Sequence, residues 1–167
     1  MKTLKIWVLC LLLGTVWDVC LARDLKQNKD TTTRVASVDG PYVLYDEAGR
    51  MRVIHVDEHG VLQDRVYDEV PEGFKLDVVS QKGGHRFQVK LHPVERPLWK
   101  SGQREKTLII SDPHGDLESF VSVLRNNGVI GKNYKWKFGK NQVIVIGDVF
   151  DRGKDVLPIF WLMYKLE

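Results

Sequence analysis

The chain has 167 residues, of which 43% are hydrophobic and 28% are charged, and this balance excludes a fibrous or an intrinsically disordered protein. Its 25 basic and 22 acidic residues leave a formal charge of +3. Because the two signs are interspersed along the chain, there is no basic stripe of the kind that binds nucleic acid. A nucleic acid is therefore not expected among the partners.

Residues 1–22 predict a signal peptide. Lys2 and Lys5 precede the apolar run 6–16, and residues 20–22 have the small-residue character of a signal-peptidase site. The run is shorter than the roughly 20 residues that a membrane-spanning helix needs. We expect cleavage after Ala22, export to the periplasm or the extracellular space, and no stable membrane span afterwards. An uncleaved anchor and a lipid on Cys20 are the less favoured alternatives.

Cysteine chemistry is excluded for the mature chain, because Cys10 and Cys20 both fall inside the leader. The following segment, 23–39, is polar, contains three consecutive threonines and lacks a periodic apolar pattern. It predicts a flexible leader into the fold. Ordered structure is therefore expected from residue 40 onward.

Residues 40–99 predict a small antiparallel β-rich domain. Short β-rich runs recur about every ten residues, with glycine-bearing turns between them, which is typical of a meander. The runs are Tyr42–Tyr45, Met51–Val56, Val61–Tyr67, Phe74–Val79 and Arg86–Lys90. Four histidines of this domain (His55, His59, His85 and His92) show no ligand spacing, and we expect them at the surface or in turns. A connector rich in Pro and Gly, 92–102, marks the boundary to the next unit.

Residues 106–167 predict the order β-α-β-α, so the fold class is α/β with a parallel layer. The runs 107–110 and 143–146 are continuously apolar, as expected for strands whose two faces are both covered by helices. Between them, apolar residues recur at helical spacing from Leu117, behind Asp116 as the predicted N-cap. A second helix, 156–166, follows Asp155 as its cap.

Two side-chain patterns of this half have a second interpretation. The lysine-rich stretch 132–140 could be a nucleic-acid patch, and the aromatic residues within 160–164 could face a membrane or a partner. A solvated loop before a buried strand and core packing of a helix are the favoured interpretations.

Polar clusters follow both predicted strands of the parallel layer, at the edge where open α/β sheets bind ligands. Asp112 and His114 share one turn and can direct an oxygen and an imidazole nitrogen at the same ion, a ligand set that suits Mn, Fe or Zn. Asp148, after the second strand, could bridge two ions, and Arg152 could bind phosphate oxygens bidentately. The sequence therefore predicts two divalent metal ions beside a phosphate.

The motifs Asp-x-His-Gly and Gly-Asp-x-x-Asp-Arg-Gly resemble those of the calcineurin-like metallophosphoesterase superfamily, over residues 106–167. The Arg resembles the Ser/Thr protein phosphatase branch, and flanking residues such as Phe138-Gly139 look most like the bacterial Shewanella-like phosphatases. The resemblance implies hydrolysis of phosphate monoesters by metal-bound hydroxide, acting on a phosphorylated small molecule or a phosphoprotein. For the β-rich domain we see only a loose similarity to N-terminal regions of secreted bacterial members.

The resemblance also implies a role for each site residue. Asp112 and His114 would hold the first metal, Asp148 would bridge both metals, Arg152 would bind substrate phosphate, and Asp151 would orient a catalytic histidine. Ser111 stands where the family usually has Gly.

The family's catalytic histidine and two further metal-binding histidines would come after Glu167. The chain is therefore expected to be the N-terminal part of the domain, inactive alone and poorly soluble because a hydrophobic edge is left uncovered. The alternative is a non-catalytic secreted remnant whose β-rich domain is a binding module.

Overall fold

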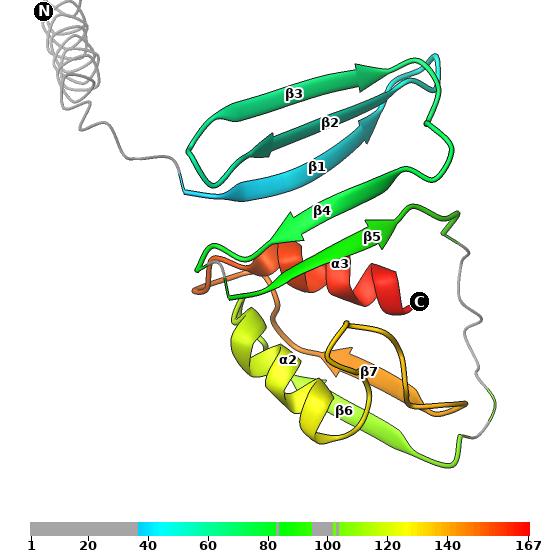
Figure 1. The fold of residues 1–167 in the computed structure, drawn as a ribbon. Coiled ribbons are helices and arrows are strands. Elements are labelled where there is room, and N and C mark those ends of the chain that lie inside the picture. The colour runs from blue at the N-terminus through cyan, green and yellow to red at the C-terminus, as the bar shows by residue number, and fades with distance from the viewer. Residues whose placement is uncertain (1–36, 83, 95–101, 103) are drawn as a thin grey trace, which may run out of the picture. The chain divides into compact units, whose positions relative to one another are not determined.

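The computed structural model describes residues 37–82, 84–94, 102 and 104–167 (Figure 1). The predicted signal peptide, most of the predicted flexible leader and part of the connector lie outside these residues. In the described part, five strands come first and a strand, a helix, a strand and a helix follow. This mixed α/β content, with antiparallel sheets and one parallel strand pair, confirms the fold class at this level.

The first three strands form an antiparallel meander in the order β1-β2-β3. Asp46 and Asp57 close the two hairpin turns, because each carboxylate accepts hydrogen bonds from backbone amides two and four residues later. Val53 of β2 pairs with Val43 and with Arg65. The strands are β1 (Asp39–Tyr45), β2 (Met51–Val56) and β3 (Leu62–Tyr67).

β4 (Lys75–Val79) and β5 (Arg86–Lys90) form a separate antiparallel hairpin, so the prediction of a single meander is wrong. After β3 the chain turns at Pro71, whose carbonyl accepts the amide of Phe74 at 3.0 Å. β4 then lies against β1 rather than pairing with β3. Side-chain burial explains this arrangement, because β3 is largely exposed whereas β4 and β5 bury every second residue.

The second half of the chain contains β6 (Thr107–Ser111), α2 (Leu117–Asn126), β7 (Gln142–Ile146) and α3 (Val156–Leu166). β6 and β7 pair in parallel, with Thr107 opposite Gln142 and Ser111 opposite Ile146. α2 begins as predicted, because the Asp116 carboxylate accepts the amide of Ser119 at 3.1 Å. A parallel pair joined by a helix brings the two polar clusters to the same end of both strands.

α3 packs against the β-rich half of the chain. Ile159 and Leu162 are fully buried, and the Trp161 indole donates to the carbonyl of Pro41 at 2.8 Å. His92 stacks on Tyr164 with ring centroids 4.1 Å apart. Among the described residues, no helix has the length and apolarity that crossing a bilayer requires.

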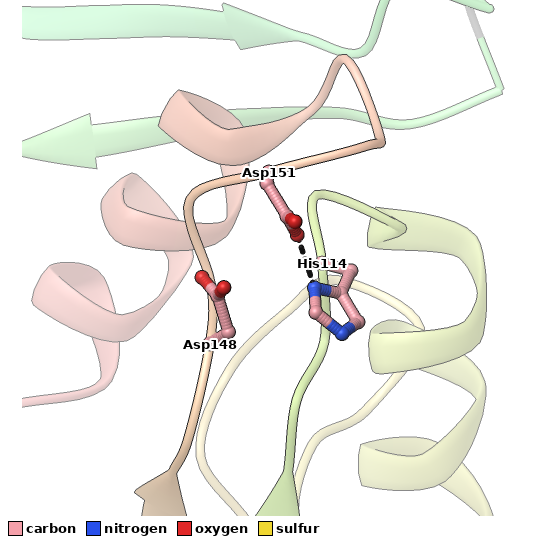
Figure 2. Close-up of side chains that lie close together, drawn as sticks. All are labelled: His114, Asp148 and Asp151. Atoms are coloured by element: carbon pink, nitrogen blue, oxygen red, sulfur yellow. Dashed lines mark hydrogen bonds and ion pairs between the residues drawn. The ribbon is translucent and has the colours of Figure 1, made fainter.

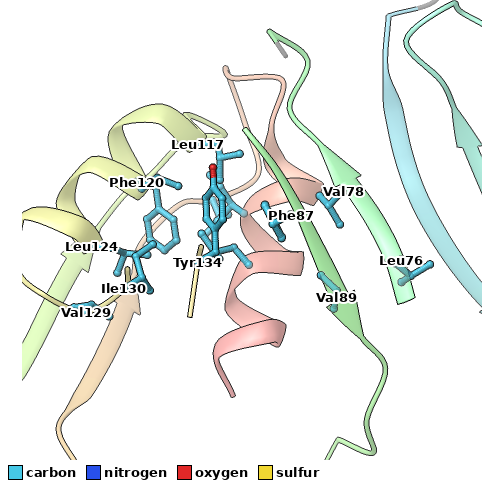
Figure 3. Packing of buried hydrophobic residues seen from close by; sticks show 14 of the residues in the cluster. Leu76, Val78, Phe87, Val89, Leu117, Phe120, Leu124, Val129, Ile130 and Tyr134 are labelled. Carbon is cyan, nitrogen blue, oxygen red and sulfur yellow. The ribbon is translucent and has the colours of Figure 1, made fainter. Parts of the chain in front are cut away.

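One hydrophobic core joins the two halves (Figure 3). Tyr134 lies between β5 and α2, with its ring centroid 5.1 Å from that of Phe87. His85 is also part of this region. It lies in the turn between β4 and β5, one of the two places expected for it, but it is not at the surface. It is only 5% exposed, and its two ring nitrogens each lie 2.8 Å from a partner, the Tyr134 hydroxyl and the Glu118 carboxylate.

The parallel strand pair has one covered face and one open face, which corrects the prediction that both faces are buried. Ile109 and Ile144 are paired in register and are 60% and 41% exposed. On the other face, Val145 lines a cavity together with Phe120 of α2 and Phe160 of α3. Both helices therefore lie on the same side, and no described element covers the isoleucines.

Candidate metal centre

The loops that follow β6 and β7 run side by side and are joined by backbone hydrogen bonds. The amide of Asp112 donates to Ile146 at 3.0 Å, that of His114 donates to Asp148 at 3.1 Å, and that of Gly153 donates back to His114 at 2.7 Å. The strand pairing thus continues into the loops. The residues of both motifs are held at fixed positions relative to each other.

Two glycines allow this close approach. A Cβ on Gly115 would lie 2.6 Å from the Gly153 carbonyl oxygen, and a Cβ on Gly153 would lie 2.2 Å from the Gly115 carbonyl oxygen. Real Cβ atoms do not approach backbone this closely, so any side chain at either position would separate the loops. The glycines of both motifs are therefore required by backbone contact.

His114, Asp148 and Asp151 form the one metal-capable group found among the described residues. Each offers a ligand atom, and these atoms all lie within 4.8 Å of one another. Figure 2 shows Asp151 directed at the His114 ring, where its Oδ1 contacts Nδ1. The other ring nitrogen of His114 makes no hydrogen bond within the described residues. One imidazole and two carboxylates form a donor set that fits a divalent transition metal.

Asp112, which the resemblance makes a metal ligand, lies outside this group. Its Oδ1 accepts the backbone amide of Asp148 at 2.9 Å, and its Oδ2 contacts the Ser111 hydroxyl. The hydroxyl of Ser111 is the main reason that the pKa of Asp112 is lowered, with the Asp148 amide and the charges of His114 and Arg152 adding to it. Asp112 is therefore a carboxylate, and its metal-binding role stays a prediction.

Backbone strain is concentrated at this site. Asp112, His114 and Arg152 have φ values of 50°, 44° and 63°, in the left-handed region that non-glycine residues seldom adopt. Tyr134 is the remaining such residue in the described part of the chain. Because such conformations cost free energy and persist only where the surrounding structure enforces them, the cluster favours a functional role for these loops.

Arg152 is strongly exposed to solvent. Its side chain is 74% exposed, and its Nε lies 3.5 Å from Oδ2 of Asp151. With Asp112 and His114 it lines a cavity of about 730 Å³, a size typical of small-ligand sites. The guanidinium can therefore bind an anion placed beside the candidate metal ligands.

The β4–β5 turn, which the sequence did not single out, also contributes to the lining of this cavity. Gln81, Lys82 and Gly84 line the cavity. The pKa of Asp116 is lowered, chiefly by hydrogen bonds from Ser119, and the positive charge of Lys82 contributes. Because this turn comes far earlier in the chain, no local pattern could have connected it with the two motifs.

The position of the Asp155 carboxylate corrects the prediction that it caps the second helix. It stands at the N-cap position of α3 but makes no capping hydrogen bond. Instead, its Oδ1 accepts the backbone amide of Gln81 at 2.7 Å. Asp155 thus attaches the β4–β5 turn to the loop that carries Arg152.

Comparison with known proteins places part of the chain among phosphatases. No model of a known protein family matches it. It is 36% identical over 63 residues to Shewanella-like protein phosphatase 2 of Arabidopsis thaliana and 43% identical over 63 residues to Shewanella-like protein phosphatase 1 of Plasmodium berghei. It is 37% identical over 59 residues to the bis(5'-nucleosyl)-tetraphosphatase PrpE of Oceanobacillus iheyensis.

These matches cover only part of each protein. The two Shewanella-like phosphatases match over 38% and 37% of this chain and over 16% and 17% of their own length. The chain therefore has partial homology to Shewanella-like protein phosphatases and to PrpE, which are relatives of the calcineurin-like metallophosphoesterases.

The fold is also similar to that of a solved protein structure. The cold-active protein-tyrosine phosphatase of a psychrophilic Shewanella species superimposes with a TM-score of 0.56 at 23% identity. The superposition covers 77% of this chain and 38% of that protein. It thus extends beyond the two motifs into the β-rich half.

Proposed function

We propose that this chain carries part of the active site of a calcineurin-like metal-dependent phosphatase that hydrolyses phosphate monoesters. The observation that carries the proposal is the convergence of His114, Asp148 and Asp151 beside Arg152, at the carboxyl end of a parallel strand pair. The partial homology to phosphatases supports the reaction class. The substrate would be a phosphorylated small molecule or a phosphoprotein.

The residues present fit a divalent cation. His114, Asp148 and Asp151 would supply the three protein ligands that a catalytic metal usually has, and the Asp112 carboxylate accepts the backbone amide of Asp148 beside them. Mn, Fe or Zn suits this mixture of nitrogen and oxygen donors. When bound, such an ion supplies Lewis-acid polarisation of a phosphoryl oxygen and activation of water.

A second ion is part of the proposal. Asp148 would be shared by both ions, and the remaining ligands would come from sequence that corresponds to the longer part of the relatives. The chain spans 38% of the phosphatase structure that it superimposes on. The described residues form one three-ligand group, which suffices for one ion.

The protein's own groups would place the substrate. The exposed Arg152 guanidinium would bind two non-bridging phosphate oxygens and hold the phosphorus next to the metal ligands. The contact of Asp151 with Nδ1 of His114 holds the imidazole beside the two carboxylates of the group. Gly115 and Gly153 keep the two loops at contact distance.

Metal titration of the full chain tests the proposal. Calorimetry with Mn²⁺ and Zn²⁺ should show saturable binding that is lost in His114→Ala. Because the chain is expected to be inactive alone, the readout of this test is metal binding and not turnover. Equal metal affinity of the wild type and His114→Ala would show that these loops do not form the metal site.

We also infer that the protein is exported, on the basis of the charged and apolar pattern of residues 1–22. N-terminal sequencing of protein purified from cells should find Arg23 as the first residue. A mature chain that still begins at Met1 and stays in the cytoplasmic fraction would contradict this inference.

A further inference from the structure

The β4–β5 turn is a structural part of the candidate site. Gln81, Lys82 and Gly84 line the same cavity as Asp112, His114 and Arg152. Lys82 is exposed to solvent there. A cationic side chain from the β-rich half thus faces the same space as the predicted phosphate ligand.

Hydrogen bonds fix this turn in place on both sides. The Gln81 amide donates to Asp155 at 2.7 Å. At the base of the turn, Ser80 and His85 exchange hydrogen bonds of 2.9 and 3.0 Å. The His85 ring is held between Tyr134 and Glu118. The backbone that carries Lys82 is therefore attached to α2 and to the loop of Arg152.

The carboxylates that line the cavity are already engaged by donors of the protein. Asp116 accepts the Ser119 amide and hydroxyl, and Glu118 lies 2.8 Å from the His85 ring. Asp155 accepts the Gln81 amide, and Asp112 accepts the Asp148 amide.

The two lysines of the cavity differ from the carboxylates. Within the part of the chain that the structure describes, Lys82 and Lys154 make no hydrogen bond or ion pair. Their ammonium groups, like the exposed guanidinium of Arg152, therefore remain available to a ligand in this cavity. An ammonium group binds carboxylate or phosphate oxygens by charge-assisted hydrogen bonds.

We propose that Lys82 is a specificity-determining residue that binds a second anionic group of the substrate. The preferred substrates are then phosphate monoesters that carry a carboxylate or another phosphate close to the scissile group. This inference rests on the proposed function, because it assumes that Arg152 and the metal ligands take the scissile phosphate. It gives the β-rich half of the chain a direct part in substrate choice.

Three non-hydrolysable probes built on the same benzene ring test this inference with the full chain in the presence of Mn²⁺. Phenylphosphonate has a single anionic group, 4-phosphonobenzoate adds a carboxylate, and benzene-1,4-diphosphonate adds a second phosphonate. Calorimetry at about 0.05 M salt keeps screening of exposed charges small. Lys82→Gln removes the charge and Lys82→Arg keeps it. Lys90→Gln removes a charge from an exposed position of β5 outside the cavity.

Lys82→Gln should weaken binding of the two probes that carry two anionic groups about three- to fivefold, as expected for one exposed charge pair. The affinity for phenylphosphonate should stay within about twofold of the wild-type value. The probe with the larger loss identifies carboxylate or phosphate as the second group. Lys82→Arg and Lys90→Gln should match the wild type.

Two results would overturn the inference and leave the proposed function standing. In one, Lys82→Gln has no effect on any probe. In the other, all three probes weaken equally, which indicates a general electrostatic effect without a subsite. Failure of phenylphosphonate itself to bind the wild type would instead contradict the proposed phosphate site, and the inference with it.

Discussion

The backbone amide of Asp148 donates a 2.9 Å hydrogen bond to Oδ1 of Asp112. A residue that follows β7 thereby fixes the carboxylate of a residue that follows β6. The two clusters are thus coupled by a side chain as well as by the backbone hydrogen bonds of their loops. A substitution at the end of one strand is therefore expected to disturb the residues at the end of the other.

Gly147→Ala should show this coupling. A Cβ at Gly147 would lie 2.3 Å from Asp112 Oδ1, and its φ is +75°. Gly49→Ala is the matched control, because its φ is +81° and nothing lies within 4 Å of the added Cβ. Urea unfolding should show Gly147→Ala to be less stable than Gly49→Ala by about 1–3 kcal/mol, the usual cost of overpacking. Equal losses of stability in the two variants would mean that the Asp112 side chain can move away from the added methyl group without cost.

Asp148→Asn should lower the Mn²⁺ affinity at least about tenfold and abolish turnover of any active form, because an amide replaces one of three grouped ligands. Asp77→Asn removes the same charge from an exposed position of β4 and should leave the Mn²⁺ affinity unchanged. Calorimetric titration of both variants measures the difference. Full affinity in Asp148→Asn would exclude Asp148 from the site.

His85→Leu should destabilise the fold by about 2–3 kcal/mol. The change removes the partner of the Tyr134 hydroxyl in a region that is otherwise apolar, and an unsatisfied buried hydroxyl is costly. The exposed His59→Leu serves as the control. The free energy of unfolding in urea gives the result, and a loss no larger than that of His59→Leu would show that His85 is dispensable.

The open face of the parallel strand pair should cause self-association. Ile109 and Ile144 are exposed side by side on it, and exposed apolar strand faces promote pairing between molecules. Ile109→Thr combined with Ile144→Thr should increase the monomer fraction in sedimentation velocity at high protein concentration. Val61→Thr, at a position 50% exposed in a turn, should not. A wild-type chain that stays monomeric would disprove the expectation.

The β2–β3 turn should lose stability in acid. The pKa of Asp57 is lowered, first by the backbone hydrogen bond from Val61 and further by His59 and Gln63. Since the folded pKa lies below the unfolded one, the unfolded chain begins to bind more protons as the pH falls through about 4. The contribution present at neutral pH therefore starts to decline there and is lost once the pH has fallen through the lower folded pKa.

Asp57→Asn should therefore show a smaller drop in melting temperature between about pH 5 and pH 3 than the wild type. Glu72→Gln, which removes an exposed acidic group from another turn, should follow the wild-type curve. Parallel curves for all three proteins would contradict the assignment.

Local patterns predicted the individual elements well. Met51–Val56, Arg86–Lys90 and Val156–Leu166 match strands and a helix of the structure, because alternation of apolar residues, helical spacing and capping are properties of short segments. The motif residues were expected at one sheet edge, and parallel pairing of β6 and β7 explains why their loops meet.

Contacts between distant segments could not be predicted in this way. The separation of β4 from the meander depends on which strands pack on the same core. The open face of β6 and β7 results from both helices packing on the same side of this strand pair. Asp155 has a cap-like position, yet its carboxylate binds Gln81, 74 residues earlier. The burial of His85 likewise follows from contacts with Tyr134 and Glu118, which no spacing encodes.

The parallel pairing of β6 with β7 also determines when the site can form during folding. Thr107 and Gln142 pair across 35 residues of chain, so the loop between them must close before either motif meets the other. Contacts of this range form more slowly than hairpins such as β4–β5. The candidate ligands therefore come together only late in folding, and a peptide that carries just one of the two motifs should have no metal site at all.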